Sequence, residues 1–269
     1  MDDRYARIIE HIFLSNYESG DSVVPFERTD LVAAAVELGV EAPKNLGDIL
    51  YAFRSRRALP AAITETEPED QSWVIAGRGR SRYAFVLKTQ SRIHPDPMLA
   101  QVKIPDATPG VVARYVLSDE QALLTKVRYN RLIDLFTGVT CYSIQNHLRT
   151  TVKGIGQVET DELYVGIDKY GAHYVFPVQA KGNNDEIGVI QIEQDMALCK
   201  EKFPDLICYA IAAQFMADEG IALFMLALEE GDLVKLAERH YQLVPLDEVS
   251  QSELERYRQR RNQGRLRGD

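Results

Sequence analysis

The chain has 269 residues, of which 45% are hydrophobic and 26% are charged, so it can bury one large core or two modest ones without disulfide staples. Its longest uninterrupted apolar run, Ile221–Leu228, is far shorter than the roughly 20 residues that cross a bilayer, which excludes a membrane-spanning helix. The net charge of −9 argues against a general nucleic-acid coat protein, but it allows a nuclease whose acidic site is offset by local basic patches.

The cysteine content indicates a reducing compartment. Cys141, Cys199 and Cys208 are an odd number of thiols without a CxxC pair, which excludes a disulfide framework and a four-cysteine zinc site. The sequence opens on Met-Asp-Asp-Arg, with no long apolar stretch after it, so we expect no secretory signal. We therefore expect a cytoplasmic protein with no membrane partner.

The first part of the chain has the pattern of a small helical unit that ends in a hairpin. Ile8–Phe13 follows helical spacing, and a second helix is predicted over 29–38 between a Thr-Asp start and a Gly stop. A third helix begins near Asn45, and two short strands follow at 73–76 and 83–87. Helix, helix, turn, helix, hairpin is the order of a winged-helix unit.

Two basic clusters lie at the places where a winged helix touches a duplex, namely the end of the third helix and the tip of the hairpin. We therefore interpret residues 1–90 as a winged-helix-like domain that binds double-stranded DNA. The predicted contacts are Arg54, Arg56, Arg57, Arg78, Arg80 and Arg82. The alternative is a small α+β accessory domain whose arginines are only solvated.

The rest of the chain is predicted to be a linker, a second domain and a tail. Residues 91–117 are rich in proline and poor in apolar residues, which is typical of a linker. Residues 118–250 alternate helical and strand patterns, which predicts an α/β (α+β) domain with a mixed sheet. Residues 251–269 form a polar C-terminal tail with six arginines, expected to be partly helical.

Within the second domain the predicted order is one helix, three strands, a second helix and further strands. The expected elements are a helix from Ser118 to about Phe136, strands at 139–152, 157–167 and 173–182, a helix over about 189–202, strands near 206–215 and 221–228, and a last segment near 233–246.

Polar side chains gather on the long hairpin formed by the second and third of these strands. Because side chains alternate along a strand, Glu159 and Asp161 point the same way. On the partner strand Gln179 and Lys181 share a face, and the apolar strand before them ends abruptly. If the hairpin brings these faces together, two carboxylates, an amide oxygen and an ammonium group converge.

Such a group could hydrolyse a phosphodiester. A hard divalent ion prefers oxygen ligands, which here are Glu159, Asp161, the Gln179 amide and the Ala180 carbonyl. The ion would polarise the scissile phosphate and activate a bound water, while Lys181 would hold that water and offset charge on phosphorus. The alternative is a solvated edge strand with salt bridges, which is the better interpretation for Glu159 taken alone.

Asp161 followed by Gln179-Ala180-Lys181 on successive strands resembles the PD-(D/E)XK nuclease superfamily in its QXK form. Residues 118–246 resemble its α-β-β-β-α-β core, and the N-terminal unit resembles DNA-reading additions of type II restriction endonucleases. The Pro-Asp pair is absent because Thr160 precedes Asp161. The resemblance implies Asp161, Gln179 and Lys181 as site residues and Mg²⁺ as the cofactor, with Mn²⁺ as a substitute.

Gln179 removes one charge from the metal site, so a further carboxylate is expected to compensate. The candidates are Glu159 and Glu120, the latter from the preceding helix. A polar residue of the following helix, Gln191, Gln194 or Asp195, could also lie near the site, and the alternative for these three is a solvated helix face. Asn146, His147 and Arg149 precede the hairpin and are predicted to contact DNA phosphates.

We therefore expect a Mg²⁺-dependent DNA endonuclease of the type II restriction class. A homodimer is the natural way to cut both strands of a symmetric site. One alternative is a repair nuclease or junction resolvase on the same core. Another is a non-catalytic winged-helix regulator that binds DNA.

Overall fold

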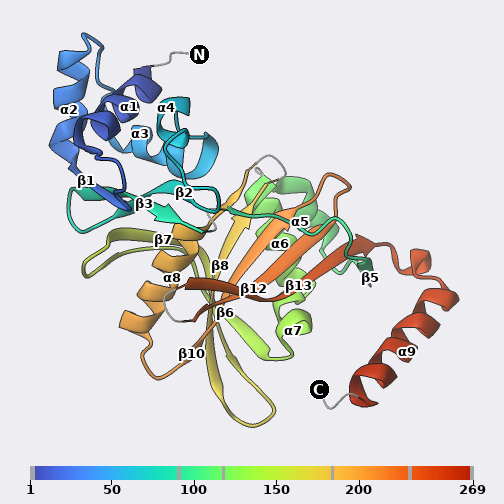
Figure 1. Ribbon diagram of the computed structural model, residues 1–269. Helices are drawn as coiled ribbons and strands as arrows, with labels where there is room; N and C mark the ends of the chain where they lie inside the picture. The colour runs from blue at the N-terminus through green and yellow to red at the C-terminus, as the bar shows by residue number, and fades with distance from the viewer. Residues whose placement is uncertain (1–3, 90–91, 117–118, 183–184, 230–231, 267–269) are drawn as a thin grey trace.

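A computed structural model describes residues 4–89, 92–116, 119–182, 185–229 and 232–266 (Figure 1). Two bodies of structure are visible, a smaller N-terminal unit and a larger unit around a broad sheet. Within the described residues no helix is long and apolar enough to cross a bilayer.

Helices and a three-stranded sheet make up the N-terminal unit. Its helical elements are α1 (Arg4–Asn16), α2 (Arg28–Glu37), α3 (Gly47–Tyr51), a π-helical turn η1 (Ala52–Arg56) and α4 (Ala61–Thr64). Its strands are β1 (Val23–Glu27), β2 (Ser72–Gly77) and β3 (Arg82–Lys88), in the antiparallel order β1-β3-β2.

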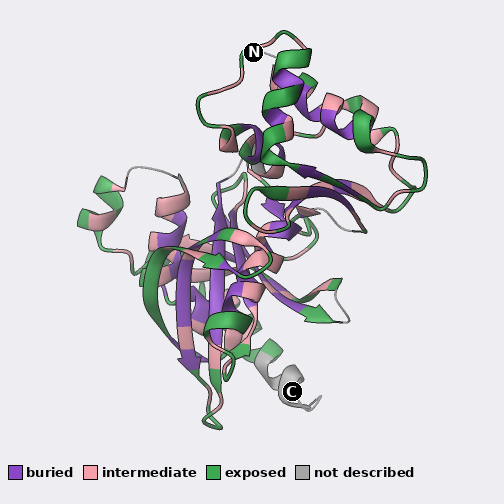
Figure 2. Cartoon of the chain, turned by 90° about the vertical axis from the view of Figure 1, so that its left-hand side faces the viewer, coloured by how far each residue is buried: buried purple, intermediate pink, exposed green. Residues whose placement is uncertain are grey.

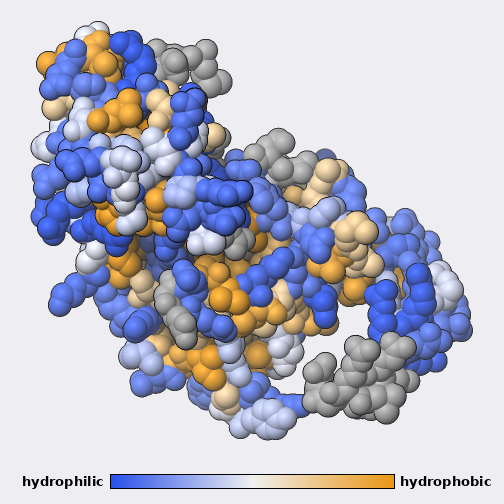
Figure 3. Space-filling view, in the orientation of Figure 1, coloured by the Kyte–Doolittle hydropathy of each residue, from blue (hydrophilic) through white to orange (hydrophobic). Residues whose placement is uncertain are grey.

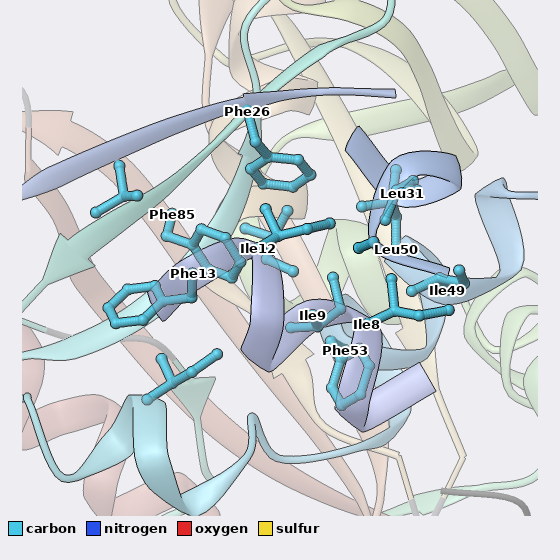
Figure 4. Close-up of a cluster of buried hydrophobic side chains, with 14 of the residues drawn as sticks. Ile8, Ile9, Ile12, Phe13, Phe26, Leu31, Ile49, Leu50, Phe53 and Phe85 are labelled. Carbon is cyan, nitrogen blue, oxygen red and sulfur yellow. The ribbon is translucent and has the colours of Figure 1, made fainter. Parts of the chain in front are cut away.

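One apolar core holds this unit together (Figure 4). Ile8, Ile12 and Phe13 recur at helical spacing on α1, so one face of that helix is buried. They pack against the sheet, where the rings of Phe13 and Phe85 meet edge to face at 5.1 Å. Leu31 of α2 and Ile49 of α3 close the other side of the same core.

The larger unit is built on a mixed sheet of eight strands among the described residues, so the predicted α/β class with a mixed sheet is confirmed. Its main strand order is β5-β13-β12-β11-β8-β7-β6, and β10 also pairs with β8. The strands are β5 (Gln101–Pro105), β6 (Thr140–Val152), β7 (Gly156–Ile167), β8 (His173–Lys181), β10 (Ile207–Cys208), β11 (Ala210–Phe215), β12 (Ile221–Glu229) and β13 (Asp232–Val244).

Helices cover both faces of this sheet. The core on one face includes α6 (Asp119–Tyr129) and α7 (Leu132–Thr137), and α8 (Val189–Lys202) packs on the opposite face. Strands β8 and β11 are therefore buried along most of their length, whereas the β6 edge of the sheet is largely exposed (Figure 2). The connection from β8 to β11 runs through α8, and these two strands are parallel.

The helix predicted from Ser118 to Phe136 is interrupted. Arg131 adopts a left-handed backbone conformation with φ 51°, which separates α6 from α7. The buried side chain of Asn130 explains the break, since it accepts from the Ala107 amide at 2.7 Å and donates to Lys126 O at 3.0 Å. This amide ties the preceding segment of the chain to the end of α6.

Part of the expected linker joins the sheets. Gln101–Pro105 forms β5, which pairs in parallel with the edge of β13, and the short strands β4 (Arg92–Ile93) and β9 (Ile187–Gly188) pair with each other. The same stretch contains α5 (Gly110–Tyr115). The prolines of this stretch argued against strands in the sequence pattern. Strand β5 nevertheless ends at Pro105, because an edge strand tolerates proline at its end.

The tail contains a short 3-10 turn η2 (Leu246–Glu248) and a helix α9 (Gln251–Leu266). This helix projects from the sheet, and its described surface is hydrophilic on the face shown in Figure 3. Its first turns are anchored to β5, because Lys103 N–H donates to the Tyr257 hydroxyl at 3.0 Å and Lys103 Nζ lies 3.2 Å from Glu253.

The hairpin tip of the N-terminal unit rests on the larger unit. Gly79 N–H donates to Ile155 O at 3.2 Å, in the turn between β6 and β7. A Cβ at Gly77 would lie 2.6 Å from the same oxygen, so only glycine permits this approach. Lys88 and Glu193 add an ion pair at 2.7 Å between β3 and α8. The two units therefore touch through β2, β3, the β6–β7 turn and α8.

Candidate functional site

The candidate site lies where β7 and β8 separate. Their pairing runs from Ile167 and His173 to Glu162 and Val178. Beyond that point the Asp161 carboxylate enters the gap, where Oδ2 accepts the Ala180 backbone N–H at 2.8 Å. The side chain thus replaces a ladder hydrogen bond, and this fixes the position of its carboxylate.

Lys181 brings a cation to the same end of β8. Its side chain is only 6% exposed, and its Nζ lies 3.7 Å from Oε1 of Glu120, which comes from the first turn of α6. Burial raises the pKa of the Asp161 carboxyl, with an opposing contribution from the Ala180 N–H and the Lys181 ammonium. The charge of Glu120 raises the pKa of Asp161 further, so the two carboxylates and the lysine form one electrostatic group.

Gln179 makes contacts of a different kind. Its Nε2 donates to Oδ2 of Asp195 at 2.8 Å and to the backbone oxygen of Glu159 at 3.0 Å. Asp195 lies on α8 and is fully buried, and this burial raises its pKa well above the ordinary value. The amide nitrogen therefore connects β8 to α8.

The structure places Glu159 away from the group of Asp161, Lys181 and Glu120. Its side chain is 53% exposed, and its Oε2 lies 3.8 Å from Nε of Arg149 on β6. Of the four predicted metal ligands, Asp161 and Ala180 thus come into contact, Gln179 is bonded to α8, and Glu159 faces an exposed arginine. Glu120, the other candidate carboxylate, joins this group through its 3.7 Å approach to Lys181 Nζ.

A metal at this place would rely on few side chains. In the described part of the chain, no group of three or more His, Cys, Asp and Glu side chains is arranged to hold an ion. The available oxygen donors are the carboxylates of Asp161 and Glu120, to which the Ala180 carbonyl can be added, since N–H and C=O of one residue in a strand point to the same side.

Of the residues on β6 that are predicted to contact phosphates, His147 lies near this group, whereas Arg149 faces Glu159. His147 has a left-handed backbone conformation with φ 47°, and its Nε2 is 2.9 Å from the Gln121 amide nitrogen. It is close enough to lower the pKa of Asp161 when it is charged. Asn146 is exposed and accepts from Arg128 at 3.0 Å, and Arg149 is 62% exposed.

The hairpin tip keeps its predicted basic character. Arg78, Arg80 and Arg82 are all exposed on one turn of the chain. Because the tip rests on the β6–β7 turn, these arginines lie next to the edge of the larger sheet. The basic tip therefore adjoins the β6–β7 turn, at one end of the β6 edge.

The end of the third helix differs from expectation. Arg54 turns inward: its Nε donates to Ile75 O at 3.0 Å, and its guanidinium lies over the Tyr83 ring, 5.5 Å from the centroid. The π-helical turn at 52–56 changes the direction of successive side chains, which the sequence pattern did not reveal. Arg57 packs over the Phe53 ring, and the side chain of Arg56 lies outside the described residues.

A second polar group under the site was missed by sequence reasoning. Glu162 is fully buried on the α6 face of β7, where it accepts from Arg128 Nε at 2.9 Å and from the Ser143 hydroxyl at 2.5 Å. The signal was present in the sequence, since Glu162 points opposite to Asp161 and hence toward the core. A charged residue at an inward position needs a partner, and the helix before it supplies Arg128.

Comparison of the chain with protein-family models, with curated proteins and with solved structures finds no match.

Proposed function

We propose that this protein is a divalent-metal-dependent endonuclease that hydrolyses phosphodiester bonds of double-stranded DNA at a specific sequence, as type II restriction enzymes do. The observation that carries the proposal is the meeting of Asp161, Lys181 and Glu120 at the point where β7 and β8 separate. Two carboxylates beside a buried lysine are a costly arrangement that catalysis can explain.

The order of elements supports the proposal. A helix, the antiparallel strands β6, β7 and β8, the helix α8 and a strand β11 parallel to β8 follow one another along the chain. This order is similar to the α-β-β-β-α-β core of PD-(D/E)XK nucleases. The N-terminal unit, with its sheet order β1-β3-β2 and its basic β2–β3 tip, is similar to a winged helix.

The residues fit a hard divalent ion such as Mg²⁺. Burial raises the pKa of Asp161, so a cation beyond Lys181 would favour its ionised form. Asp161 and Glu120 would hold the ion through carboxylate oxygens, with the Ala180 carbonyl as a third donor. When bound, the ion supplies polarisation of the phosphate and a lower pKa for a coordinated water.

The chain's own groups would do the remaining work. Lys181 is held in place by burial and by Glu120, so its ammonium can orient an attacking water and offset negative charge on the phosphate. The Ala180 N–H fixes one oxygen of Asp161 and leaves the other for the ion. Asn146 and Arg149 on β6, with the arginines of the hairpin tip, would guide the duplex toward this edge.

Two copies of the chain would act together on a symmetric DNA site, each cutting one strand.

The test of the proposed nuclease activity incubates purified protein with supercoiled plasmid and Mg²⁺. We expect discrete fragments with Mg²⁺ or Mn²⁺ and none with EDTA. Undiminished cleavage in excess EDTA would refute the metal-dependent mechanism.

One observation favours a second candidate, a DNA-binding regulator without nuclease activity. The Gln179 amide nitrogen is bonded to Asp195 and to the Glu159 carbonyl, which are contacts of a structural residue. A chain that binds one duplex sequence in Ca²⁺ and never cuts it in Mg²⁺ or Mn²⁺ would support this candidate against the nuclease.

A further inference from the structure

A cavity of about 190 Å³ lies at the junction of the two units, apart from the site at Asp161. Its lining comes from the end of the third helix, from β2 and from the start of α8. Phe53, Leu59 and Trp73 give it an apolar wall. A cavity of about 150 Å³ holds a benzene-sized molecule, so this one has room for a small organic ligand.

The start of α8 opens into this cavity. Gly188, Val189, Ile190 and Gln191 all line it, and they are the N-cap and the first three residues of the helix. Glycine at the N-cap offers no side-chain acceptor, and the first turn contains no acidic residue. The backbone N–H groups of a helix start carry a partial positive charge and accept an anion readily.

Arg54 lines the same cavity. Its Nη2 atom is buried and has no hydrogen-bond partner among the described residues. Burial lowers the pKa of Arg54, and no described carboxylate lies within ion-pair distance of it. Glu67, the acid in the lining, accepts the Trp73 N–H at 2.8 Å instead. Arg54 is half-buried, and a cationic nitrogen buried without a partner is costly, so an anionic ligand would remove that cost.

Gln191 supplies a third unsatisfied group. Its Oε1 is buried without a partner among the described residues. A Cβ at Gly188 would lie 3.4 Å from Arg54 O and 3.8 Å from this Oε1, so both residues flank the N-cap of α8. The amide oxygen can accept a hydrogen bond from a ligand, or the amide can turn to present its N–H₂ group.

We propose that this cavity binds a phosphate group, held by the Arg54 guanidinium and by the backbone N–H groups that open α8. Arg92, also in the lining, is already paired with Glu186 at 3.0 Å, so Arg54 supplies the charge. The phosphate comes from a small phosphomonoester or from the backbone of bound DNA, and both offer the same oxyanion to the site. The apolar wall favours a phosphomonoester that carries a ring.

A ligand bound here would contact α8, the helix whose Asp195 accepts a hydrogen bond from Gln179 of β8. Asp195 lies on α8, six residues after Val189, and accepts from Gln179 of β8. A phosphate at the start of α8 would fix this helix against the N-terminal unit. Binding itself is independent of the proposed nuclease activity, so it is tested without any cleavage assay.

The experiment measures binding of inorganic phosphate and of phenyl phosphate to the full chain by titration calorimetry, and it records the melting temperature with and without each ligand. We expect saturable binding and a higher melting temperature in the wild type. Arg54→Met should weaken binding at least about tenfold, whereas the control Arg114→Met, on exposed α5, should not change it.

A second variant, Gln191→Glu, tests the same site if Arg54→Met does not fold. It places a carboxylate in the third position of α8 beside Arg54, so it should raise the melting temperature and abolish phosphate binding together. The proposal is overturned if the wild type shows no saturable binding of either ligand up to about 10 mM, or if Arg54→Met or Gln191→Glu binds phosphate as the wild type does.

A second arm separates the two sources of phosphate. Binding of a random duplex is measured for the wild type, Arg54→Met and Arg114→Met at one salt concentration. If Arg54→Met alone reduces duplex affinity and phenyl phosphate competes with the duplex, the site takes a DNA phosphate. If duplex affinity is unchanged while phosphate binding is abolished, the site takes a free phosphomonoester.

Discussion

Gln179 of β8 donates its side-chain N–H to the Asp195 carboxyl of α8 at 2.8 Å, and both side chains are buried. The other oxygen of Asp195, Oδ1, is buried without a partner among the described residues. Gln179, which resembles a metal ligand in the sequence, is therefore hydrogen-bonded to α8. The carboxyl that accepts this hydrogen bond, that of Asp195, has a strongly raised pKa.

This relationship predicts a pH effect on stability. The unfolded Asp195 loses its proton near pH 4, whereas the folded one keeps it to a higher pH because burial raises its pKa. The free energy of unfolding should therefore fall as pH rises above about 4, by about 1.4 kcal/mol per pH unit at most, until the folded group ionises. Asp195→Asn should remove this fall, as measured by urea unfolding at several pH values.

The exposed Asp205→Asn variant is the control and should keep the wild-type dependence. An Asp195→Asn protein whose stability declines with pH as steeply as the wild type would show that another group is responsible.

Asp161→Ala and Lys181→Ala should each reduce DNA cleavage by at least about 100-fold, because one removes the carboxylate that would hold the ion and the other removes the ammonium beside it. Plasmid cleavage in Mg²⁺ measures this effect, and circular dichroism checks the fold. Asp161→Asn, which keeps the shape and one oxygen, serves as the conservative variant. Full cleavage by a folded Asp161→Ala protein would end the assignment.

Two glutamates compete for the place of the missing carboxylate, and the geometry favours Glu120 over Glu159. Glu120→Gln should raise the Mg²⁺ concentration needed for half-maximal cleavage by about tenfold, because it removes the charge of one ligand. The matched change Glu159→Gln should leave that concentration within about twofold of the wild-type value, since an exposed side chain that faces Arg149 does not reach the ion. The reverse order in a Mg²⁺ titration would restore Glu159 as the ligand.

Much of the fold could be predicted because the hydrophobic periodicity of a long segment distinguishes a helix from a strand. The helix at 189–202 and the hairpin around Asp168 have the predicted bounds to within one or two residues. The segments missed by the sequence pattern are short, and tertiary contacts decide them. Strand β5 exists because β13 offers a free edge, and α6 ends where the Asn130 side chain binds another segment.

The site was predictable in its strand positions but not in its side-chain partners. Alternation along β7 places Asp161 and Glu162 on opposite faces, as the sequence requires. Whether the Gln179 side chain turns toward Asp161 or toward α8 depends on how α8 packs against β8. The spacing of residues in the sequence does not determine this packing. Arg54 is a similar case, since it lies in a π-helical turn and its side chain bonds to Ile75 O of β2 and is half-buried.

The ion pair between the partly exposed Arg128 and the fully buried Glu162 should matter for stability. Arg128→Met leaves the fully buried Glu162 without its cation and should cost about 3 kcal/mol of unfolding free energy. The double variant Arg128→Met/Glu162→Gln should recover most of that stability, because it removes the uncompensated charge. Arg131→Met, which breaks the more exposed pair with Asp134, should cost less than about 1 kcal/mol. Equal destabilisation by the two single arginine variants in urea unfolding would contradict this account.

The hairpin tip and the C-terminal helix are rival basic surfaces for DNA, and they should differ in what they contribute. The first variant changes Arg78, Arg80 and Arg82 to Ala. The second removes residues 258–269, which keeps Tyr257 and its hydrogen bond to Lys103. Binding is measured in Ca²⁺ to a duplex that the protein cuts in Mg²⁺ and to a random duplex of equal length.

We expect the truncation to weaken both duplexes alike, because a helix that projects from the sheet through its first turns has little to fix its arginines against bases. We expect the tip variant to discriminate less between the duplexes, since the tip is held in place against the β6–β7 turn. For every arginine that binds a phosphate, its replacement should also lower the salt dependence of binding by about one unit. If the tip variant keeps both its affinity and its discrimination, the N-terminal unit does not read the DNA sequence, and recognition belongs to the larger unit around β6.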